Sequence, residues 1–404
     1  MAQKPHLLPY LSRRASFERL EPRAPLPIIP DFDLTLSQPQ QAKLGGLDPR
    51  WCTERSNQPY QPDCRGARSA RQALCTYLSS RAQLGPDDVL LTASTSEAYA
   101  FLLLTLCDPG DAILVPQPGY PLLDDIAQLL SVRLVSYSLK YDGSWFIDTS
   151  TLPDKSQIKH DKIRAIVVIS PHHPTGHVLS VDERAHLEDC GVPLIVDEVF
   201  SPYILDVGSR DSDPLGEGSE GALCLVLGGL SKSVAAPGLK LGWMIGRGRG
   251  AREFLGELEF ISDAFLSVNQ LVQEGLAQIL SQAEAIQHNI RERLLFNRAT
   301  AERIFARGAG VADERDGSFE PNPVSALPAH SGWSMILRLP HIMDEATWCE
   351  KALDVGVKVQ PGSLYALPFQ ASFVISLLTE PAAFEQALIR LNELVRTMLF
   401  ADLS

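Results

Sequence analysis

Short runs of valine, isoleucine and leucine, set between helix-like segments, constrain the fold of this chain more than any other feature. They occupy Asp111–Pro116, Arg133–Ser138, Arg164–Ser170, Pro193–Asp197 and Leu223–Gly228. Apolar runs of this length are typical of strands buried on both faces, and intervening helices are typical of parallel connections. The sequence therefore predicts an α/β fold with a mostly parallel sheet.

The length of the chain predicts two domains. Its 404 residues exceed what one hydrophobic core usually supports. A stretch in which Gly, Pro and Ser recur, at 308–330, precedes alternating apolar segments and a final helix. We predict a large α/β domain over 47–300, and a small α+β domain that combines the arm 1–46 with 301–404.

Charge and cysteine content limit the partners and the location. The formal net charge of −13 argues against nucleic acid and anionic membranes. No apolar run is long enough for a membrane span, and the first residues lack the apolar core of a secretion signal. The seven cysteines show no Cys-x-x-Cys pair or metal-site spacing. We therefore expect reduced thiols, a cytoplasmic location and no metal.

The segment LVLGGLSKSVAAPGLKLGWMIG, residues 225–246, contains the first candidate catalytic group. A strand-like run ends in two glycines, Ser231 and Lys232 follow, and Lys240 comes eight residues after Lys232. Burial and a neighbouring cation lower the pKa of a lysine and let it act as a free amine. Taken alone, the segment is also compatible with a plain loop carrying two solvated lysines.

Two further segments add polar groups at the ends of predicted strands. Asp197 ends the apolar run PLIVD, where a buried carboxylate needs a cationic or hydrogen-bonding partner. His172 and His173 lie in SPHHPTG, a Pro- and Gly-containing turn after another run. Two adjacent histidines rarely converge on one ion, and no Asp or Cys partner is indicated, so a metal site is not expected.

Ser94, Thr95 and Ser96 lie where a loop enters a helix. Helix N-terminal amides and hydroxyls suit a phosphate, although an ordinary N-cap with Glu97 in the first turn produces the same pattern. Tyr120 follows the run Asp111–Pro116. Tyr60 stands in a Pro-containing segment before a helix, where a surface turn is the alternative.

In this order the segments resemble the class I and II aminotransferases, fold-type-I enzymes that use pyridoxal 5'-phosphate (PLP). The resemblance extends from about Asp33 to about Leu399. It implies a mostly parallel seven-stranded sheet, a small α+β domain and a homodimer. It also implies transfer of an amino group between an amino acid or amine and a 2-oxo acid.

The resemblance also implies a role for each candidate. Lys232 would hold PLP as a Schiff base and move a proton, with Ser231 beside it. Asp197 would keep the pyridine nitrogen protonated, and Tyr120 would stack on the ring. The remaining candidates would hold the phosphate of PLP: Ser94, Thr95, Ser96, Lys240 and Tyr60. Tyr60 would do so from the other subunit, across the dimer interface.

Three positions depart from the family pattern. His173 and Phe200 replace the asparagine and tyrosine that bond the phenolic oxygen of PLP, and Val374 replaces the arginine that binds the substrate α-carboxylate. Another cation, backbone near Ser37, or a substrate without that carboxylate would then be needed. Two alternatives stay open: a PLP-dependent lyase (carbon–sulfur β-elimination or decarboxylation) and a non-catalytic PLP-fold binding protein.

Overall fold

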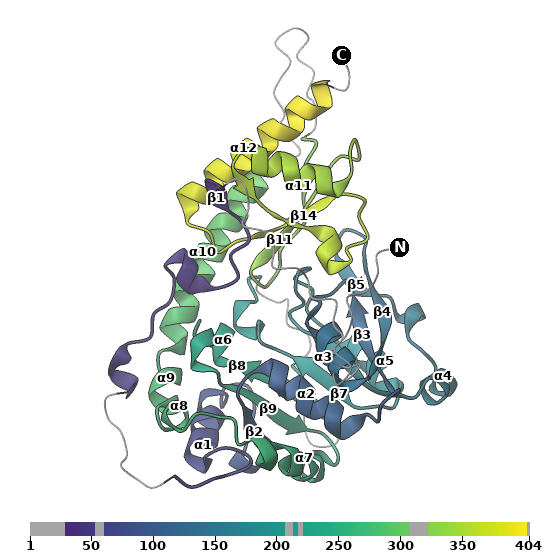
Figure 1. The fold of residues 1–404 in the computed structure, drawn as a ribbon, viewed down its shortest axis with the longest axis vertical. Coiled ribbons are helices and arrows are strands. Elements are labelled where there is room, and N and C mark those ends of the chain that lie inside the picture. Colours follow the sequence, from purple (N-terminus) through teal and green to yellow (C-terminus); the bar gives the residue numbers. More distant parts are fainter. Residues whose placement is uncertain (1–28, 53–59, 207–212, 217–220, 307–321, 402–404) are drawn as a thin grey trace, which may run out of the picture.

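The computed structural model describes residues 29–52, 60–206, 213–216, 221–306 and 322–401. Within these residues the strands form a larger sheet, a smaller sheet and one separate strand pair. The larger sheet and its helices occupy one end of the molecule, and the smaller sheet and the C-terminal helix occupy the other (Figure 1). None of the described helices is both long enough and apolar enough to cross a bilayer.

The larger sheet is built on the apolar runs. Eight strands form it within the described residues, in the spatial order β2 (Val89–Thr92), β9 (Gly242–Arg247), β8 (Cys224–Gly229), β7 (Leu194–Asp197), β6 (Ile163–Ile169), β3 (Ala112–Gln117), β4 (Arg133–Tyr141) and β5 (Trp145–Ile147). The four neighbouring pairs from β8 to β4 are parallel. The remaining pairs, β2–β9, β9–β8 and β4–β5, are antiparallel. The prediction of a mostly parallel sheet is confirmed.

The sheet has one strand more than the seven predicted. β5 is three residues long and pairs with the end of β4 after a tight turn around Gly143, whose φ is +79°. Its burial alternates between Trp145, Phe146 and Ile147. Three residues contain too few alternating positions for a strand to be read from the sequence. The predicted strand count is therefore wrong at this edge.

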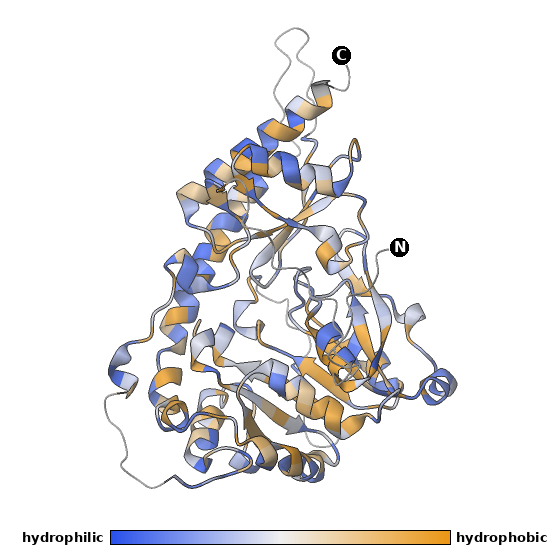
Figure 2. Cartoon of the chain, in the orientation of Figure 1, coloured by the Kyte–Doolittle hydropathy of each residue, from blue (hydrophilic) through white to orange (hydrophobic). Residues whose placement is uncertain are grey.

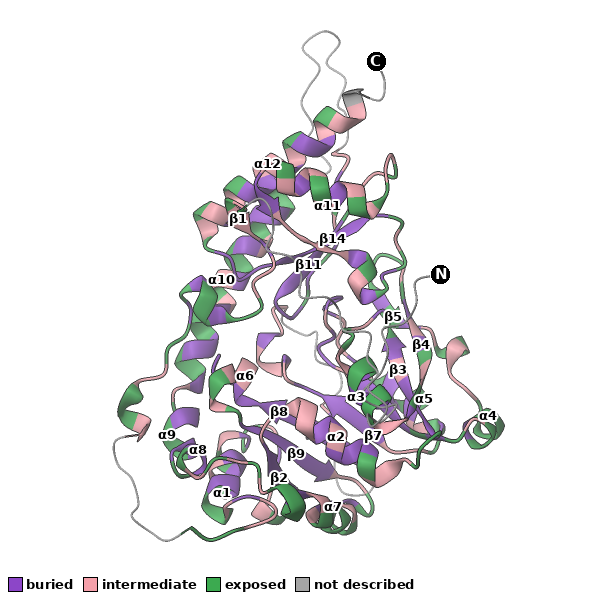
Figure 3. Ribbon diagram, in the orientation of Figure 1, coloured by how far each residue is buried: buried purple, intermediate pink, exposed green. Residues whose placement is uncertain are grey.

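Burial on both faces explains why the central runs are continuously apolar. In β7, Leu194 and Val196 pack into the hydrophobic cluster on one face, and Ile195 packs into the cluster on the other. Hydrophobic residues dominate β7 in Figure 2, and β7 and β9 are largely buried in Figure 3. With no polar face to present, these strands lack the polar alternation of a half-exposed sheet.

Helices cover both faces of the sheet. α2, α3 and α7 contribute to one cluster, through residues such as Leu102, Ile126 and Leu258. α1, α5 and α9 contribute to the other, through residues such as Leu74, Leu187 and Ile279. The helices of this region are α1 (Arg68–Tyr77), α2 (Thr95–Leu106), α3 (Leu122–Leu130), α4 (Lys155–His160), α5 (Val181–Asp189), α6 (Leu230–Ser233), α7 (Ala251–Phe265), α8 (Gln270–Glu274), α9 (Leu276–Leu280) and α10 (Ala283–Ile304).

The smaller sheet lies beyond α10 in the sequence. Its order is β10 (Ser325–Ala326), β11 (Ser334–Arg338), β14 (Ser372–Ser376) and β13 (Gln360–Pro361), and all three pairs are antiparallel. It is accompanied by α11 (Glu345–Asp354) and α12 (Pro381–Ala401). The predicted domain division at 300 stays a prediction, and α10 runs through it.

The N-terminal arm joins this smaller part. β1 (Phe32–Asp33) pairs in parallel with β12 (Val357–Lys358). The Leu34 amide donates to the Lys358 carbonyl at 3.0 Å, and the Ser376 amide donates to the Leu34 carbonyl at 2.7 Å. These bonds hold the residues that follow, up to Ser37, against the larger sheet.

Candidate active site

Three neighbouring parallel strands deliver the main polar groups. β6, β7 and β8 lie side by side, so their carboxyl ends meet at one edge of the sheet. His173 follows β6, Asp197 ends β7, and Lys232 lies in α6 directly after β8. The parallel topology therefore brings together residues that are far apart in the sequence.

These groups open into a cavity of about 310 Å³ between the two sheets. The larger sheet and its loops supply one side, which includes Ser94, Thr95, Tyr120, His173, Asp197, Phe200, Ser231 and Lys232. The arm and the smaller sheet supply the other, which includes Ser37, Trp333, Ser334, Gln360, Tyr365, Val374 and Ser376. The volume is within the range of small-ligand sites.

Among the described residues that line this cavity, Lys232 is the one lysine, and there is no arginine. Its Nζ donates to the Ser37 carbonyl at 3.3 Å and lies 4.7 Å from the ring centroid of Trp333. Burial lowers the pKa of Lys232 from 10.5 to about 8, although the Asp197 carboxylate opposes that change. The amine therefore loses its proton at a lower pH than an ordinary lysine, which favours nucleophilic attack.

Asp197 is 7% exposed, so its carboxyl group is buried at the end of an apolar strand. The Tyr99 hydroxyl donates to its Oδ2 and the Val199 amide donates to its Oδ1, both at 3.1 Å. Burial nevertheless raises the pKa of Asp197 from 3.8 to about 6. The carboxylate lacks a full counter-charge, and a protonated ring nitrogen would supply one.

The N-terminus of α2 faces the same cavity. Ser94 is the N-cap of this helix, and its hydroxyl accepts from the Glu97 amide at 3.1 Å, so the ordinary capping interpretation is correct. Ser94 and Thr95 also line the cavity, whereas Ser96 is not among its lining residues. A capped helix start with hydroxyls at a cavity wall remains suited to an anion.

His173 and Phe200 pack face to face at one end of the cavity. Their ring centroids are 5.7 Å apart, with an angle of 29° between the rings. Tyr120, 51% exposed, presents its edge to His173 at 5.9 Å. Burial, with Lys232 nearby, lowers the pKa of His173 to about 3, so the imidazole is neutral.

His172 has a different environment. Its Nδ1 lies 2.8 Å from the Thr175 hydroxyl, and its side chain is outside the set that lines the cavity. Within the described residues, no group of three or more His, Cys, Asp or Glu side chains is arranged to hold a metal ion.

Val374 lies in β14, between Ile336 of β11 and Gln360 of β13. It is 1% exposed and lines the cavity, so the position that holds arginine in the family is apolar here. Phe369 packs against Tyr141 at the end of β4 and Trp145 at the start of β5, and it is not among the residues that line the cavity.

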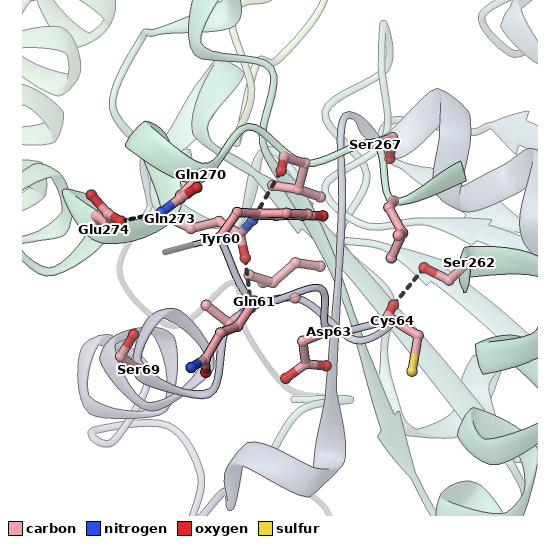
Figure 4. A pocket seen from close by; sticks show the side chains of 15 residues that line it. Tyr60, Gln61, Asp63, Cys64, Ser69, Ser262, Ser267, Gln270, Gln273 and Glu274 are labelled. Carbon is pink, nitrogen blue, oxygen red and sulfur yellow. Dashed lines mark hydrogen bonds between the residues drawn. The ribbon is translucent and has the colours of Figure 1, made fainter. Parts of the chain in front are cut away.

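Lys240 and Tyr60 do not line the cavity. Lys240 is exposed and ends a 3₁₀ turn at Pro237–Leu239 with φ of +50°. Tyr60 is 56% exposed and lines a separate hollow of about 360 Å³ with Asp63, Ser267 and Gln270 (Figure 4). One copy of the chain does not bring either residue to Lys232.

Several cavity residues were not predicted from the sequence, among them Tyr99, Trp333 and Ser334. Tyr99 looks like an ordinary apolar position of α2, and only its distance from Asp197 reveals its hydroxyl as a partner. Trp333 and Ser334 come from a segment more than 100 residues after Asp197 along the chain. Trp333 itself was the available signal, since tryptophan is enriched at binding surfaces.

The lining fits PLP on observations of this structure. The lysine has a lowered pKa, the buried carboxylate has a raised pKa, and hydroxyls stand at the start of α2. The aldehyde of PLP would react with such an amine, its pyridine nitrogen would pair with such a carboxylate, and its phosphate would accept from such hydroxyls.

Comparisons with known proteins give a consistent picture. The family model "Aminotransferase class I and II" matches residues 53–391. Glutamate-pyruvate aminotransferase AlaA of Haemophilus influenzae is 28% identical over 259 residues, which cover 62% of this chain and 63% of that protein. Nicotianamine aminotransferase A of Hordeum vulgare is 34% identical over 186 residues, covering 44% and 39%. The chain thus spans less than two thirds of the length of these curated relatives.

A solved structure shares the fold over almost its whole length. Tyrosine aminotransferase from Leishmania infantum superposes with a TM-score of 0.75 at 22% identity, covering 91% of each chain. The predicted fold-type-I architecture is confirmed by this likeness.

Proposed function

The chain belongs to the aminotransferase class I and II family, and from this premise we propose that it is a PLP-dependent aminotransferase that moves an amino group from an amine or amino acid to a 2-oxo acid. The observation that carries the proposal is the placement of Lys232 and Asp197 in one cavity. The amine is primed to lose its proton, and the carboxylate is primed to accept a cationic partner.

PLP, when bound, supplies an aldehyde that takes up the amino group and a ring that withdraws electrons from the substrate carbon. Asp197 would hold a proton on the ring nitrogen, and Tyr99 would fix the orientation of that carboxylate. Ser94 and Thr95, at the positive end of α2, would bind the phosphate. Lys232 would carry the proton between the reacting carbon atoms.

The substrate side of the cavity supports a preference for apolar substrates. Val374, Tyr365 and Trp333 face the cavity there, and polar contacts come from neutral groups such as Gln360. Apolar contact grows with substrate area, whereas a carboxylate would find no arginine among the described lining residues. Bulky amino acids or amines are the expected donors, and backbone near Ser37 would contribute to their binding.

We also propose that the active form is a homodimer. Tyr60 points across the hollow shown in Figure 4, where Gln273 is held by the Ala67 amide and the Val268 carbonyl. An exposed tyrosine at a preformed hollow fits a role that needs a second copy, in which Tyr60 reaches the partner's phosphate site. Sedimentation at working concentration tests this: an active monomer would contradict it.

A cytoplasmic location is part of the same proposal. Cys64 and Cys107 are partly exposed free thiols, and Cys75 and Cys190 are buried free thiols. Free thiols persist in reducing compartments.

The experiment that tests the function mixes PLP-loaded protein with a panel of amino acids and follows the spectrum. Conversion of one cofactor per site to its amine form supports transfer. Continuous release of pyruvate or ammonia would favour the lyase alternative, and no spectral change would favour a binding protein. Borohydride treatment followed by peptide mapping should place the cofactor on Lys232, and label on Lys240 would contradict the assignment.

A further inference from the structure

His173 and Ser334 form a hydrogen bond that connects the two sheets inside the cavity. His173 lies on the loop between β6 and α5, and Ser334 is the first residue of β11. The Ser334 hydroxyl lies 3.3 Å from Nδ1 of His173. Ser334 is buried, and its hydroxyl makes no other hydrogen bond among the described residues.

The segments that carry the two residues are fixed against each other. The Ser331 hydroxyl donates to the Gly176 carbonyl at 2.8 Å, and the Gly332 amide donates to the Tyr203 carbonyl at 2.9 Å. Gly176 has φ of +72°, and a Cβ there would lie 2.9 Å from the Ser331 carbonyl oxygen. The start of β11 therefore has little room to slide along the histidine loop, and the Ser334–His173 contact belongs to a rigid joint.

The surroundings of His173 keep its imidazole neutral. The rings of Phe200, Tyr120 and Tyr365 pack around it, and Lys232 is the nearby charged group. Burial together with that ammonium lowers the pKa of His173 well below its usual range. A neutral imidazole has one N–H and one bare nitrogen, and the bond made by one nitrogen decides the state of the other.

Nε2 of His173 is the nitrogen left for a ligand. Nε2 has no hydrogen-bond partner among the described residues. It is also not among the polar side-chain atoms that are fully buried without a partner, so it is accessible to solvent in the cavity. A serine hydroxyl can donate or accept, so the distance to Nδ1 alone does not choose the tautomer. The Ser334 hydroxyl makes no other hydrogen bond among the described residues, so its proton is left to donate to Nδ1. The resulting N–H at Nε2 suits an anionic ring oxygen, which needs a donor that Phe200 does not supply.

We propose that the Ser334 hydroxyl donates to Nδ1 and thereby keeps the proton of His173 on Nε2, where it is donated to the phenolic oxygen of PLP. The identity of the acceptor rests on the proposed function. Ser334 is a positioning residue, because it acts on the cofactor through His173. The smaller sheet would thus set the electronic state of a cofactor held by the larger one.

The tautomer is tested first on the cofactor-free protein. Nitrogen NMR of ¹⁵N-histidine-labelled protein distinguishes the two tautomers, and His173→Asn identifies the signals of His173 by their loss. We expect a proton on Nε2 in the unmodified chain and a mixture of both tautomers in Ser334→Ala. A proton on Nδ1 in the unmodified chain, or an unchanged spectrum in Ser334→Ala, would overturn the proposal.

The effect on the ligand is tested by titrating the visible absorption band of the PLP-loaded protein. Losing one charge-assisted hydrogen bond should raise the midpoint in Ser334→Ala by on the order of one pH unit, or about tenfold in the proton equilibrium. In the His173→Asn background Ser334→Ala should have no effect, because an amide has no tautomer to lose. Equal shifts in both backgrounds would overturn the proposal.

Ser376→Ala is the matched control. Ser376 is the register partner of Ser334 and lines the same cavity, but its hydroxyl accepts from the Leu378 amide at 3.2 Å. It should leave the histidine signals and the midpoint in place, and a shift as large as that of Ser334→Ala would contradict a specific role. If the protein does not bind PLP, the proposed function is wrong and so is the phenolic oxygen as the acceptor from Nε2, but NMR still tests the tautomer of His173. If it transfers amino groups but Ser334→Ala changes nothing, the inference alone fails.

Discussion

Replacing Asp197 with asparagine should stabilise the cofactor-free protein, although it damages the site. The pKa of Asp197 is about 6 in the folded chain and about 3.8 when unfolded. The folded state therefore holds a proton in the pH window where the unfolded state has lost it, and stability falls as pH rises from 3.8 to 6. Above pH 6 the full cost of the buried charge is present.

The size of this cost follows from the two pKa values. Their difference corresponds to about 3 kcal/mol at pH 7, and the cost at pH 4.5 is about 1 kcal/mol. Asparagine keeps the shape and carries no charge, and the Tyr99 hydroxyl can turn to accept from its amide. Lys232 loses an attractive neighbour, which subtracts from the gain at pH 7. The variant should therefore gain up to about 2 kcal/mol more at pH 7 than at pH 4.5.

Urea unfolding of the cofactor-free proteins at the two pH values measures this difference. Asp142→Asn, which removes an exposed carboxylate in the turn after β4, is the control for the loss of a surface charge. Added PLP should stabilise the unmodified protein more than Asp197→Asn, because the ligand binds only the folded state and loses its charge partner in the variant. A variant less stable at pH 7, or one whose gain is equal at both pH values, would refute a raised pKa at Asp197.

Three further predictions concern two positions of the site and the packing of the larger sheet. Phe200→Tyr adds a donor near His173 and should lower the midpoint of the absorption band by about one pH unit; an unchanged midpoint would place the ring oxygen elsewhere. Val374→Arg should speed half-reactions with alanine and aspartate by roughly tenfold or more, at some cost in thermal stability, and should not speed the half-reaction with a bulky donor. Equal rates for small and bulky donors in the unmodified enzyme would contradict the proposed preference for apolar substrates. Gly228→Ala would drive a Cβ into the Trp243 ring and should cost about 1–3 kcal/mol in unfolding free energy, whereas Gly256→Ala, which meets open space on α7, should be neutral or stabilising by up to about 1 kcal/mol.

The sequence predicts one half of the cavity well, for a physical reason. Lys232 and Asp197 each follow a continuous apolar run, and parallel strands bring such ends together whatever the loops do. Their placement needs only the order of the runs. The roles given to them rest on the family resemblance.

The other half could not be predicted because it depends on distances between remote segments. Ser334 reaches His173 only through the register of β11 with the loop at Gly176, and no local pattern encodes that register. Tyr99 is similar, since its apolar ring fits a helix core whether or not its hydroxyl has a carboxylate to bond. Tyr60 lines a separate hollow, and the role expected of it needs a second copy of the chain.

The pairing of the arm with the smaller sheet also determines when the site can be completed during protein synthesis. Asp33 bonds Lys358, 325 residues later in the chain. At about 5–20 residues per second, the arm leaves the ribosome tens of seconds before its partner strand exists. The larger sheet can assemble in that interval, whereas the segment Leu34–Ser37 has to wait with its apolar side chains uncovered. Nascent chains should therefore acquire the wall around Lys232 before the cover formed by the arm, and chaperones that shield apolar segments would act on the arm during this delay.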